Sequence, residues 1–278
     1  MSVNIFNLAS LRKRIKPFRL HWFSRVRSTN DHAARLRRAG KLFAPSIVLA
    51  SNQIHGRGRG ANRWWSGEGS LTLTFVLPVA EHLQPQQVPL IAGLAVRNAL
   101  AEISGADSIQ LKWPNDLLHL DRKLAGLLCE RVRNVDLIGV GVNVNVPGRK
   151  LPPRLRDHAT SLLQMTGASL DMNDVVATLA RHVHSRLSRH NDHHFGAILR
   201  EYDRHHSLVG RRVAVSAAPI ATSLRDDVDN PNRDKPRDKP LTGVCVGLDG
   251  TGRLLLRDRS STLHRIVAGH VSLVPAHR

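Results

Sequence analysis

Apolar residues in the first two thirds of the chain follow two patterns, short runs of strand length and longer stretches with helical spacing. Five segments have the length and composition of strands: residues 46–51, 70–77, 108–112, 123–131 and 136–146. Three segments carry apolar side chains on one helical face: residues 31–39, 86–104 and 173–190. Because residues 70–77 alternate hydroxyl and apolar side chains, we expect that strand to be buried on one face only.

The order of these segments favours an α+β domain with a mixed sheet and helices, because they form no repeated βαβ units. We expect the first helix to start after the hydroxyl side chains of Ser28 and Thr29 and to end at Gly40. Gly139 and Gly141 lie inside the last strand-like run. Glycines within strands often mark places where a ligand or another backbone comes close.

The C-terminal part of the chain has a different pattern. Short strand-like runs occur within residues 209–216 and 241–274, separated by Gly and Asp turns. We therefore expect a small β-barrel domain over residues 207–278. Between the runs, residues 221–240 are charged, rich in proline and nearly free of apolar side chains. Such a composition buries too little surface to fold, so we expect a disordered insertion there.

The net charge does not change the expected fold. The chain has 41 Lys and Arg against 22 Asp and Glu, a net charge of +19, which speeds association with any acidic partner. The basic residues are spread through the chain, so we interpret most of the excess as a solvated surface. Residues 1–19 are expected to form a basic arm, too short for a helix-turn-helix domain, ahead of a main domain at residues 20–206.

Composition also narrows the class of protein. With 278 residues, of which 41% are hydrophobic, the chain can fold into one large domain and a small one. Two cysteines make a disulfide framework improbable. The apolar runs are too short for a membrane span or a secretory signal, so we expect a cytoplasmic protein with no membrane partner.

Residues 53–66 (QIHGRGRGANRWWS) interleave glycines with arginines. Guanidinium groups such as those of Arg57 and Arg59 bind carboxylates or phosphates bidentately, and glycines leave the loop free to fold over a ligand. Trp64 and Trp65 would then shield the ligand from water. The same composition is typical of Gly/Arg-rich RNA-binding segments, so the loop alone leaves that alternative open.

Residues 112–116 (KWPND) place an amide and a carboxylate at the end of a strand. Asn115 and Asp116 could read a nucleobase or ribose, and Asp116 is a candidate Mg²⁺ ligand. An ordinary Asx turn is the commoner reading of such residues. Lys123 begins the next strand-like run, where a single lysine is usually a surface charge, and Asn143 follows the glycines of the last run.

Taken together and in this order, these motifs resemble those of the biotin–protein ligases. That family carries an STN element, a GRGRxGRxW loop, a KWPND turn, a K-L-x-G strand and a G-x-N-x-N strand. The similarity covers about residues 20–275 and is to the form that lacks an N-terminal DNA-binding domain. It implies a biotin/lipoate ligase-type catalytic domain followed by an SH3-like β-barrel.

The resemblance also implies an activity and a set of roles. The enzyme would activate biotin with ATP and Mg²⁺ to biotinyl-5′-AMP, then pass biotin to a lysine of a biotin carboxyl carrier protein of acetyl-CoA carboxylase or a related carboxylase. Lys123, Arg57 and Arg59 would be catalytic. Biotin would be held by Ser28, Thr29, Asn30, Gln53, Arg57, Gly58, Arg59 and Lys123. ATP would be held by Arg63, Trp64, Asn115, Asp116 and Asn143.

Three positions depart from the family pattern. Ala61 and Asn62 stand where the loop usually has Gly and Arg, and Gly67 replaces a proline. Two other functions stay open: a lipoate–protein ligase or octanoyltransferase on the same scaffold, and a basic nucleic-acid-binding protein. We expect a monomer or weak homodimer with no specific DNA binding.

Overall fold

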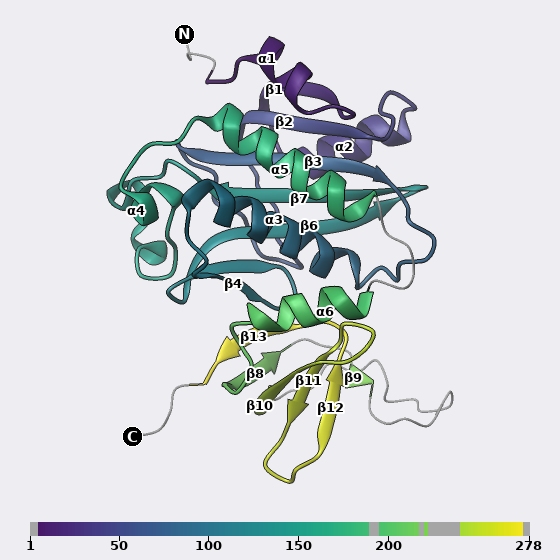
Figure 1. Ribbon diagram of the computed structural model, residues 1–278, viewed down its shortest axis with the longest axis vertical. Helices are drawn as coiled ribbons and strands as arrows, with labels where there is room; N and C mark the ends of the chain where they lie inside the picture. The colour runs from purple at the N-terminus through teal and green to yellow at the C-terminus, as the bar shows by residue number, and fades with distance from the viewer. Residues whose placement is uncertain (1–4, 189–194, 217–219, 222–239, 275–278) are drawn as a thin grey trace.

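The computed structural model describes residues 5–188, 195–216, 220–221 and 240–274. A large domain built on a seven-stranded sheet is followed by a smaller domain built on a six-stranded sheet, with helix α6 (Phe195–Arg204) lying between them (Figure 1). A mixed sheet with helices followed by an antiparallel sheet confirms the α+β fold class expected from the sequence.

The large sheet has the strand order β1-β2-β3-β7-β6-β5-β4. Only β1 and β2 are parallel, and each other neighbouring pair is antiparallel, so the sheet is mixed. Its strands are β1 (Arg19–Val26), β2 (Ser46–Gln53), β3 (Ser70–Pro78), β4 (Ile109–Lys112), β5 (Asp116–His119), β6 (Arg122–Val132) and β7 (Val135–Asn143). The motif-bearing strands β6 and β7 are central neighbours, which brings the predicted site residues together.

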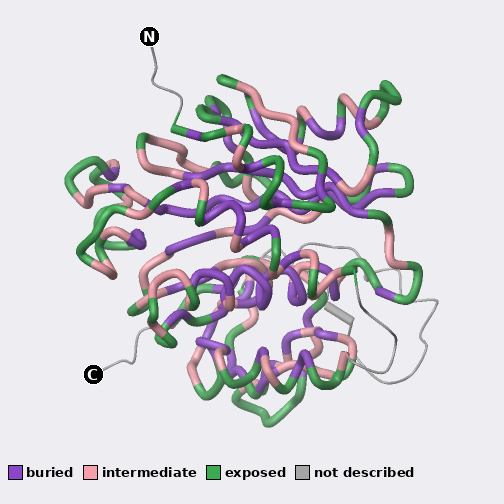
Figure 2. Tube along the Cα trace, turned by 45° about the horizontal axis from the view of Figure 1, so that its top comes forward, coloured by how far each residue is buried: buried purple, intermediate pink, exposed green. Residues whose placement is uncertain are grey.

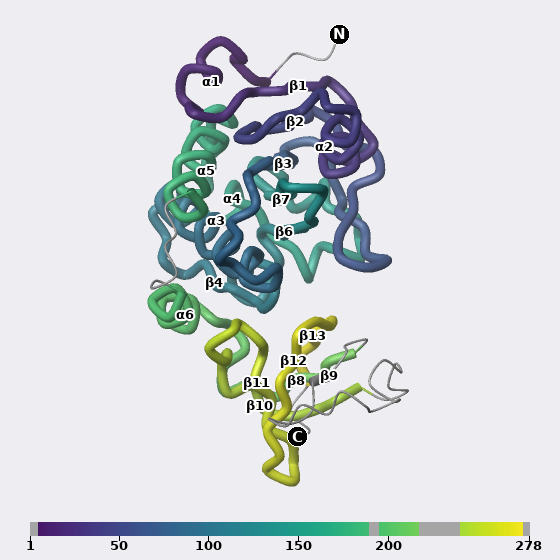
Figure 3. Tube along the Cα trace, turned by 90° about the vertical axis from the view of Figure 1, so that its right-hand side faces the viewer, coloured from purple at the N-terminus to yellow at the C-terminus, as the bar shows by residue number. Residues whose placement is uncertain are grey.

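Helices cover both faces of this sheet. Helices α3 (Val88–Ser104) and α5 (Met172–Leu187) pack together on one face, and α2 (Thr29–Arg38) packs on the other (Figure 3). Helix α3 ends at Gly105, which takes the left-handed conformation with φ 66°. The remaining short helices are α1 (Leu8–Arg14), α4 (Leu162–Thr166) and two 3₁₀ turns, Gly148–Lys150 and Pro153–Leu155.

Strand β3 is buried on both faces, so the expectation of a half-buried strand was wrong. Two of its hydroxyl side chains are enclosed by the protein instead of facing water. Thr72 and Thr74 are buried, and Thr74 Oγ1 donates to Asn30 Oδ1 at 2.7 Å. Because threonine can hydrogen-bond within a protein interior, alternation with apolar residues did not indicate exposure here.

The N-terminal segment is not a free basic arm. Leu11, Ile15 and Phe18 are buried in the main core, while the intervening Arg12 and Lys13 are exposed. The apolar residues are three or four positions apart, which places them on one side of the chain at the end of the sheet. The described part of residues 1–19 therefore belongs to the large domain, and its basic residues only form the outer surface.

The smaller domain is entirely β within the described residues. Its strands are β8 (Arg212–Ser216), β9 (Ile220–Ala221), β10 (Leu241–Leu248), β11 (Leu254–Arg257), β12 (Leu263–Ile266) and β13 (His270–Leu273). They pair antiparallel in the order β13-β8-β10-β11-β12-β9. The predicted insertion at residues 221–240 falls almost wholly at residues 222–239, outside the described residues, and stays a prediction.

Burial follows the central strands of the large sheet and the helix faces turned toward it (Figure 2). Core side chains such as Phe75, Leu94 and Val140 join the sheet to α3 in one cluster that continues into the small domain through Tyr202 and Leu256. The two domains therefore share one continuous core. Among the helices that the structure describes, none is both long and apolar enough to span a membrane.

Candidate active site

A cleft of about 1140 Å³ opens between strands β6 and β7, the N-terminus of α2, the Gly/Arg-rich loop and the small domain. All thirteen residues assigned to the site from sequence line it: Ser28, Thr29, Asn30, Gln53, Arg57, Gly58, Arg59, Arg63, Trp64, Asn115, Asp116, Lys123 and Asn143. Segments more than one hundred residues apart in the chain thus meet in one place.

Glycines form the floor of this cleft. Gly139 and Gly141 alternate on one face of β7, and Gly126 pairs with Gly141 from β6. A Cβ atom on Gly139 would overlap the Asn30 amide, and one on Gly141 would overlap the Trp64 indole. The strand glycines therefore let these two side chains lie directly on the backbone, as expected where something must approach a strand closely.

One end of the cleft is formed by the start of α2. The Ser28 side chain caps the helix by accepting from Asp31 N, so the helix begins at Thr29, two residues earlier than the sequence indicated. Gln53 Oε1 accepts from Thr29 N at 2.9 Å, and Gln53 Nε2 donates to Ser66 Oγ at 3.3 Å. This end thus presents hydroxyl and amide groups and no buried charge.

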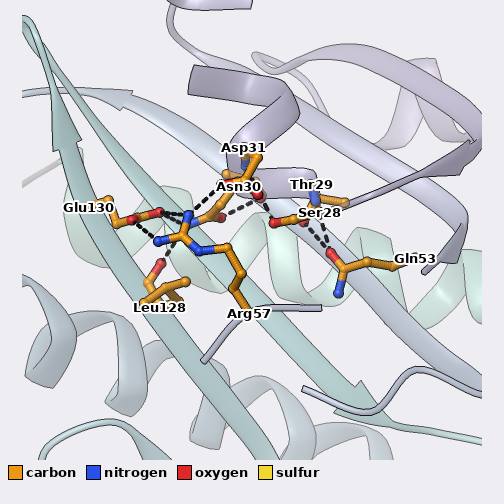
Figure 4. A network of polar contacts seen from close by, with 9 residues as sticks. Ser28, Thr29, Asn30, Asp31, Gln53, Arg57, Leu128 and Glu130 are labelled. Carbon is orange, nitrogen blue, oxygen red and sulfur yellow. Dashed lines mark hydrogen bonds and ion pairs between the residues drawn. The ribbon is translucent and has the colours of Figure 1, made fainter. Parts of the chain in front are cut away.

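Asn30 is held by contacts on three sides (Figure 4). Its amide nitrogen donates to Leu128 O at 3.0 Å and to Glu130 Oε2 at 2.8 Å, while its oxygen accepts from Thr74. Three hydrogen bonds hold this buried amide in one orientation, and the second lone pair of its oxygen remains for a ligand.

The Arg57 side chain is held at the α2 end of the cleft. Its guanidinium pairs with Asp31 and with Glu130 Oε1, the latter at 2.7 Å (Figure 4). The hydrogen bond to Glu130, more than that to Asp31, raises the pKa of Arg57 above its ordinary value. Two carboxylates therefore offset the charge that sequence reasoning assigned to ligand binding.

The Gly/Arg-rich loop closes on itself in a tight turn. Gly58 N donates to Asn62 O at 2.8 Å and Asn62 N donates to Arg59 O at 3.1 Å, while Arg57 and Arg63 pair as an antiparallel bridge. Arg59 Nη1 reaches across to the Gly269 carbonyl of the small domain at 3.4 Å. Burial lowers the pKa of Arg59, although a guanidinium remains charged at any physiological pH.

Lys123 and Asp116 form the charged centre of the cleft. The Lys123 Nζ lies 2.7 Å from Asp116 Oδ1 and 5.7 Å from the centre of the Trp64 ring. The Lys123 backbone donates to His158 O and accepts from Thr160 N, so residues 158–160 run beside β6 and hold it in place. The ammonium group is thus positioned by an acidic partner, an aromatic ring and the strand.

Asn115 and Asn143 line the cleft, but their amide nitrogens are already used. Asn115 Nδ2 donates to Leu127 O at 2.7 Å, and buried Asn143 Nδ2 donates to Thr160 O at 2.9 Å. Both side chains tie neighbouring segments together and so shape the wall that sequence reasoning assigned to ATP.

Several residues in or beside the cleft were missed from the sequence. Glu130 holds Asn30 and Arg57 from beside the cleft, but β6 also carries two arginines and a lysine, so its charge gave no local signal. Lys112, at the start of the KWPND motif, also lines the cleft, and burial lowers the pKa of its ammonium group. Arg211 of the small domain pairs with Asp121 at 2.6 and 3.1 Å, a contact that no local pattern in the sequence indicates.

The structure explains why position 67, a proline in the family pattern, is a glycine here. A Cβ atom at Gly67 would overlap the six-membered ring of Trp65. Trp65 in turn packs against a small apolar cluster of Val146, Leu151 and Ala159. The second tryptophan of the loop thus anchors its C-terminal end, whereas Trp64 enters the cleft.

Comparison with known proteins agrees with this geometry. Residues 22–146 match the Biotin/lipoate A/B protein ligase family, and residues 234–274 match the Biotin protein ligase C terminal domain. The Biotin--[acetyl-CoA-carboxylase] ligase of Paracoccus denitrificans is 34% identical over 165 residues, which are 56% of this chain and 68% of that protein. The chain belongs to the biotin protein ligase family.

Solved structures show the same relationship for the fold. A biotin protein ligase from Aquifex aeolicus in complex with biotin and ATP superposes with a TM-score of 0.76 and 26% identity, covering 92% of this chain and 99% of that one. A biotin protein ligase from Leishmania major, in complex with biotinyl-5-AMP, is 23% identical with a TM-score of 0.58 and supports the fold alone. The SH3-like assignment of the small domain is thereby confirmed.

Relatives of this family differ in length. The bifunctional ligase/repressor BirA of Escherichia coli is 26% identical over 258 residues, which are 91% of this chain and 73% of that protein. BirA of Bacillus subtilis is 30% identical over 236 residues, 82% of this chain and 66% of that protein. The chain thus spans between about two thirds and three quarters of these relatives.

Proposed function

We propose that this protein is a biotin–protein ligase, an ATP-dependent, AMP-forming enzyme that makes biotinyl-5′-AMP and transfers biotin to a lysine of a carrier protein. The observation that carries the proposal is the polarity of one continuous cleft. At the end formed by α2, hydroxyl and amide groups lie beside Arg57, whose charge is offset by two carboxylates. At the other end, Lys123, Lys112 and Arg59 lie toward the small domain.

The end formed by α2 suits the ureido ring of biotin. A ureido group offers a carbonyl acceptor and N–H donors, and hydrogen-bonding groups at Ser28, Thr29 and Asn30 can pair with them without burying a charge. Each of these side chains keeps one donor or acceptor position beyond its contacts within the protein, and a ligand without polar groups would leave that position unused.

The cationic end suits the chemistry. Attack of a carboxylate on the α-phosphate of ATP brings two anions together, so positive charge must lie where negative charge develops. Lys123, held between Asp116 and the Trp64 ring, supports this role best, with Arg59 beside it on the loop. Removing one such preorganised donor typically lowers the rate about 10²–10³-fold.

Mg²⁺ fits this cleft only when it is bound together with the nucleotide phosphates. Within the residues that the structure describes, no group of three His, Cys, Asp or Glu side chains could hold a metal ion. Mg²⁺ is commonly bound through one or two carboxylates and the substrate phosphates, and Asp116 is the residue that would supply a carboxylate here. The ion would offset part of the triphosphate charge.

The second half-reaction needs a protected intermediate. A mixed anhydride hydrolyses readily, so water must be kept out until the acceptor amine arrives. The loop at residues 56–63 and residues 268–273 of the small domain face each other across the cleft, joined by the Arg59–Gly269 contact. Once bound, the acceptor lysine would attack the acyl carbon and release AMP.

The carrier remains part of the proposal. We propose the biotin carboxyl carrier protein of acetyl-CoA carboxylase or a related carboxylase, as in the name of the Paracoccus relative. A cytoplasmic location, a monomeric or weakly dimeric state and the absence of specific DNA binding stay predictions from the sequence.

The competing functions are less well supported. The family that matches residues 22–146 includes lipoate ligases, but the apolar dithiolane ring of lipoate offers no partner for the remaining donor and acceptor positions around Asn30. A nucleic-acid-binding role would need the loop arginines to face a phosphate backbone. Instead, Arg57 is engaged by two carboxylates, and Arg59 is half-buried in the cleft.

The test is transfer to a carrier. Purified protein is incubated with MgATP, biotin and a biotin carrier domain, and the carrier is analysed by mass spectrometry. We expect one biotin on a single carrier lysine and one AMP released for each, with no transfer to a carrier whose acceptor lysine is replaced by arginine. An unmodified carrier alongside an active reference ligase would contradict the proposal.

A further inference from the structure

Glu130 contacts two different parts of the site with one carboxylate. Its Oε1 accepts from Arg57 Nη2 at 2.7 Å, and its Oε2 accepts from Asn30 Nδ2 at 2.8 Å (Figure 4). Arg57 is 73 residues away in the chain and Asn30 is 100 residues away. Strand β6 is therefore the point at which the α2 end of the cleft and the Gly/Arg-rich loop are joined.

A second carboxylate strengthens this join. Asp31, the residue after Asn30, pairs with Arg57 from the first turn of α2. The Arg57 and Asp31 side chains keep 43% and 48% of their exposure, while Glu130 keeps 30%. Each pair on its own would be weak at such exposure, but a guanidinium shared by two carboxylates forms a small network, which is more stabilising.

We propose that Glu130 is a positioning residue that sets the biotin-side amide of Asn30 and, through Arg57, fixes the start of the Gly/Arg-rich loop. Arg57 then acts as the anchor of the loop and not as a ligand of the phosphates. The charge needed at the reacting atoms comes from Lys123 and Arg59. The catalytic consequence rests on the proposed ligase function, whereas the anchoring of the loop does not.

Two substitutions separate the two duties of Glu130. In Glu130→Gln, the side-chain carbonyl still accepts from Asn30 Nδ2, but the charge that holds Arg57 is lost. In Glu130→Ala, both contacts are lost. The matched control is Glu102→Gln on α3, which removes a carboxylate paired with Arg181 and His182 outside the cleft.

Loop anchoring is measured without biotin or ATP. Trypsin cuts after Arg59 and Arg63 only when the loop opens, and the new termini are identified by mass spectrometry. We expect cleavage at these bonds to be about fivefold faster in Glu130→Gln, as for loss of a partly exposed ion pair. Arg57→Gln also loses the pair with Asp31 and should give at least this increase, and the double variant should not exceed Arg57→Gln. Glu102→Gln should match the wild type.

Steady-state kinetics separate the contact of Glu130 with Asn30 from its contact with Arg57. We expect Glu130→Gln to keep the KM for biotin within about twofold and to release more adenylate, because only the loop is loosened. Glu130→Ala should also raise the KM for biotin about tenfold, since the Asn30 amide loses an acceptor.

Two outcomes would overturn the proposal: unchanged loop cleavage in Glu130→Gln, or an equal rise of the KM in the Gln and Ala variants. If Glu130→Ala does not fold, the loop-cleavage rates of Glu130→Gln and Asp31→Asn test the proposal. In both variants the side-chain amide oxygen can still accept a hydrogen bond. If cleavage responds as expected but wild-type protein makes no adenylate, the ligase proposal fails and the loop anchor stands.

Discussion

Lys123 and Asp116 face each other from adjacent strands, with Nζ 2.7 Å from Oδ1. The missing side chain of Gly126 makes room for both groups, because a Cβ there would lie 3.1–3.3 Å from Lys123 Cε and Nζ and from Asp116 Oδ1. Lys123 keeps 38% of its exposure and Asp116 24%, so the pair remains open to the cleft. A bound anion can therefore reach the ammonium group without unfolding either strand.

The first prediction concerns this lysine. Lys123→Ala should lower the rate of biotinyl-adenylate formation at least about 10²-fold, because a preorganised cation is lost from the reacting centre. Adenylate formation is followed by biotin-dependent exchange of labelled pyrophosphate into ATP. Lys150→Ala, which breaks an exposed pair with Glu68, is the control and should keep full activity. Exchange at the wild-type rate in Lys123→Ala would refute the role.

Arg59 offers a prediction about retention of the intermediate. Arg59→Gly removes the contact with the Gly269 carbonyl that joins the loop to the small domain. We expect adenylate to form more slowly, because Arg59 also supplies charge at the reacting atoms, but a larger share of it to escape and biotinylate lysines of a bystander protein such as serum albumin. Streptavidin blotting measures this labelling. Labelling no greater than that by the wild type would show that Arg59 does not hold the cleft closed.

The glycine floor gives a prediction about biotin affinity. Gly139→Ala places a methyl group against the Asn30 amide and should raise the KM for biotin about tenfold by displacing a hydrogen-bonded side chain. Gly93→Ala on α3 is the matched control, since its Cβ would meet only Leu111 Cδ2 at an ordinary 3.5 Å. A similar KM in both variants would mean that Asn30 does not contact biotin.

The ion pair between Asp121 of the large domain and Arg211 predicts that stability depends on pH. The hydrogen bond from Arg211 lowers the pKa of Asp121 below its ordinary value of 3.8. A lowered carboxyl pKa stabilises the folded state above that ordinary value, and the stabilisation is lost as pH falls through the folded pKa. Asp121→Asn should therefore lower the free energy of unfolding by about 0.2–1 kcal/mol at pH 7, the range for exposed pairs.

Thermal unfolding measures that effect. The difference in Tm between wild type and Asp121→Asn should shrink as pH falls from 6 toward 3. Asp157→Asn, at an exposed position with no ion pair among the described residues, should show no difference at any pH. A difference for Asp121→Asn that is independent of pH would contradict the electrostatic explanation.

Much of the fold was predictable because its signals are local. The strands at β2, β6 and β7 and the helices α2, α3 and α5 each carry a continuous apolar pattern, and their predicted bounds differ from the observed ones by only a few residues. Strand β1 was missed because its residues, RLHWFSRV, alternate weakly at a half-exposed sheet edge. Strand β5 was not predicted, because it has only four residues and begins inside the KWPND motif.

The sequence predicted which residues line the site but not which side chains pair with one another. Motif order pointed to the residues that line the cleft, including Asn30 and Lys123. The partners of Arg57 were not visible, because Glu130 meets it only when β6 lies between β5 and β7 with a particular register. Register between distant strands depends on packing of the whole sheet, and no local pattern specifies it.

The central claim, that one cleft joins biotin to ATP, is tested most directly by identifying the acyl-adenylate. Purified protein is mixed with MgATP and either biotin or lipoate, without a carrier, and the bound products are extracted and weighed by mass spectrometry. We predict biotinyl-5′-AMP with biotin and no acyl-adenylate with lipoate. Lipoyl-AMP in place of biotinyl-AMP, or no adenylate with either acid, would contradict the account.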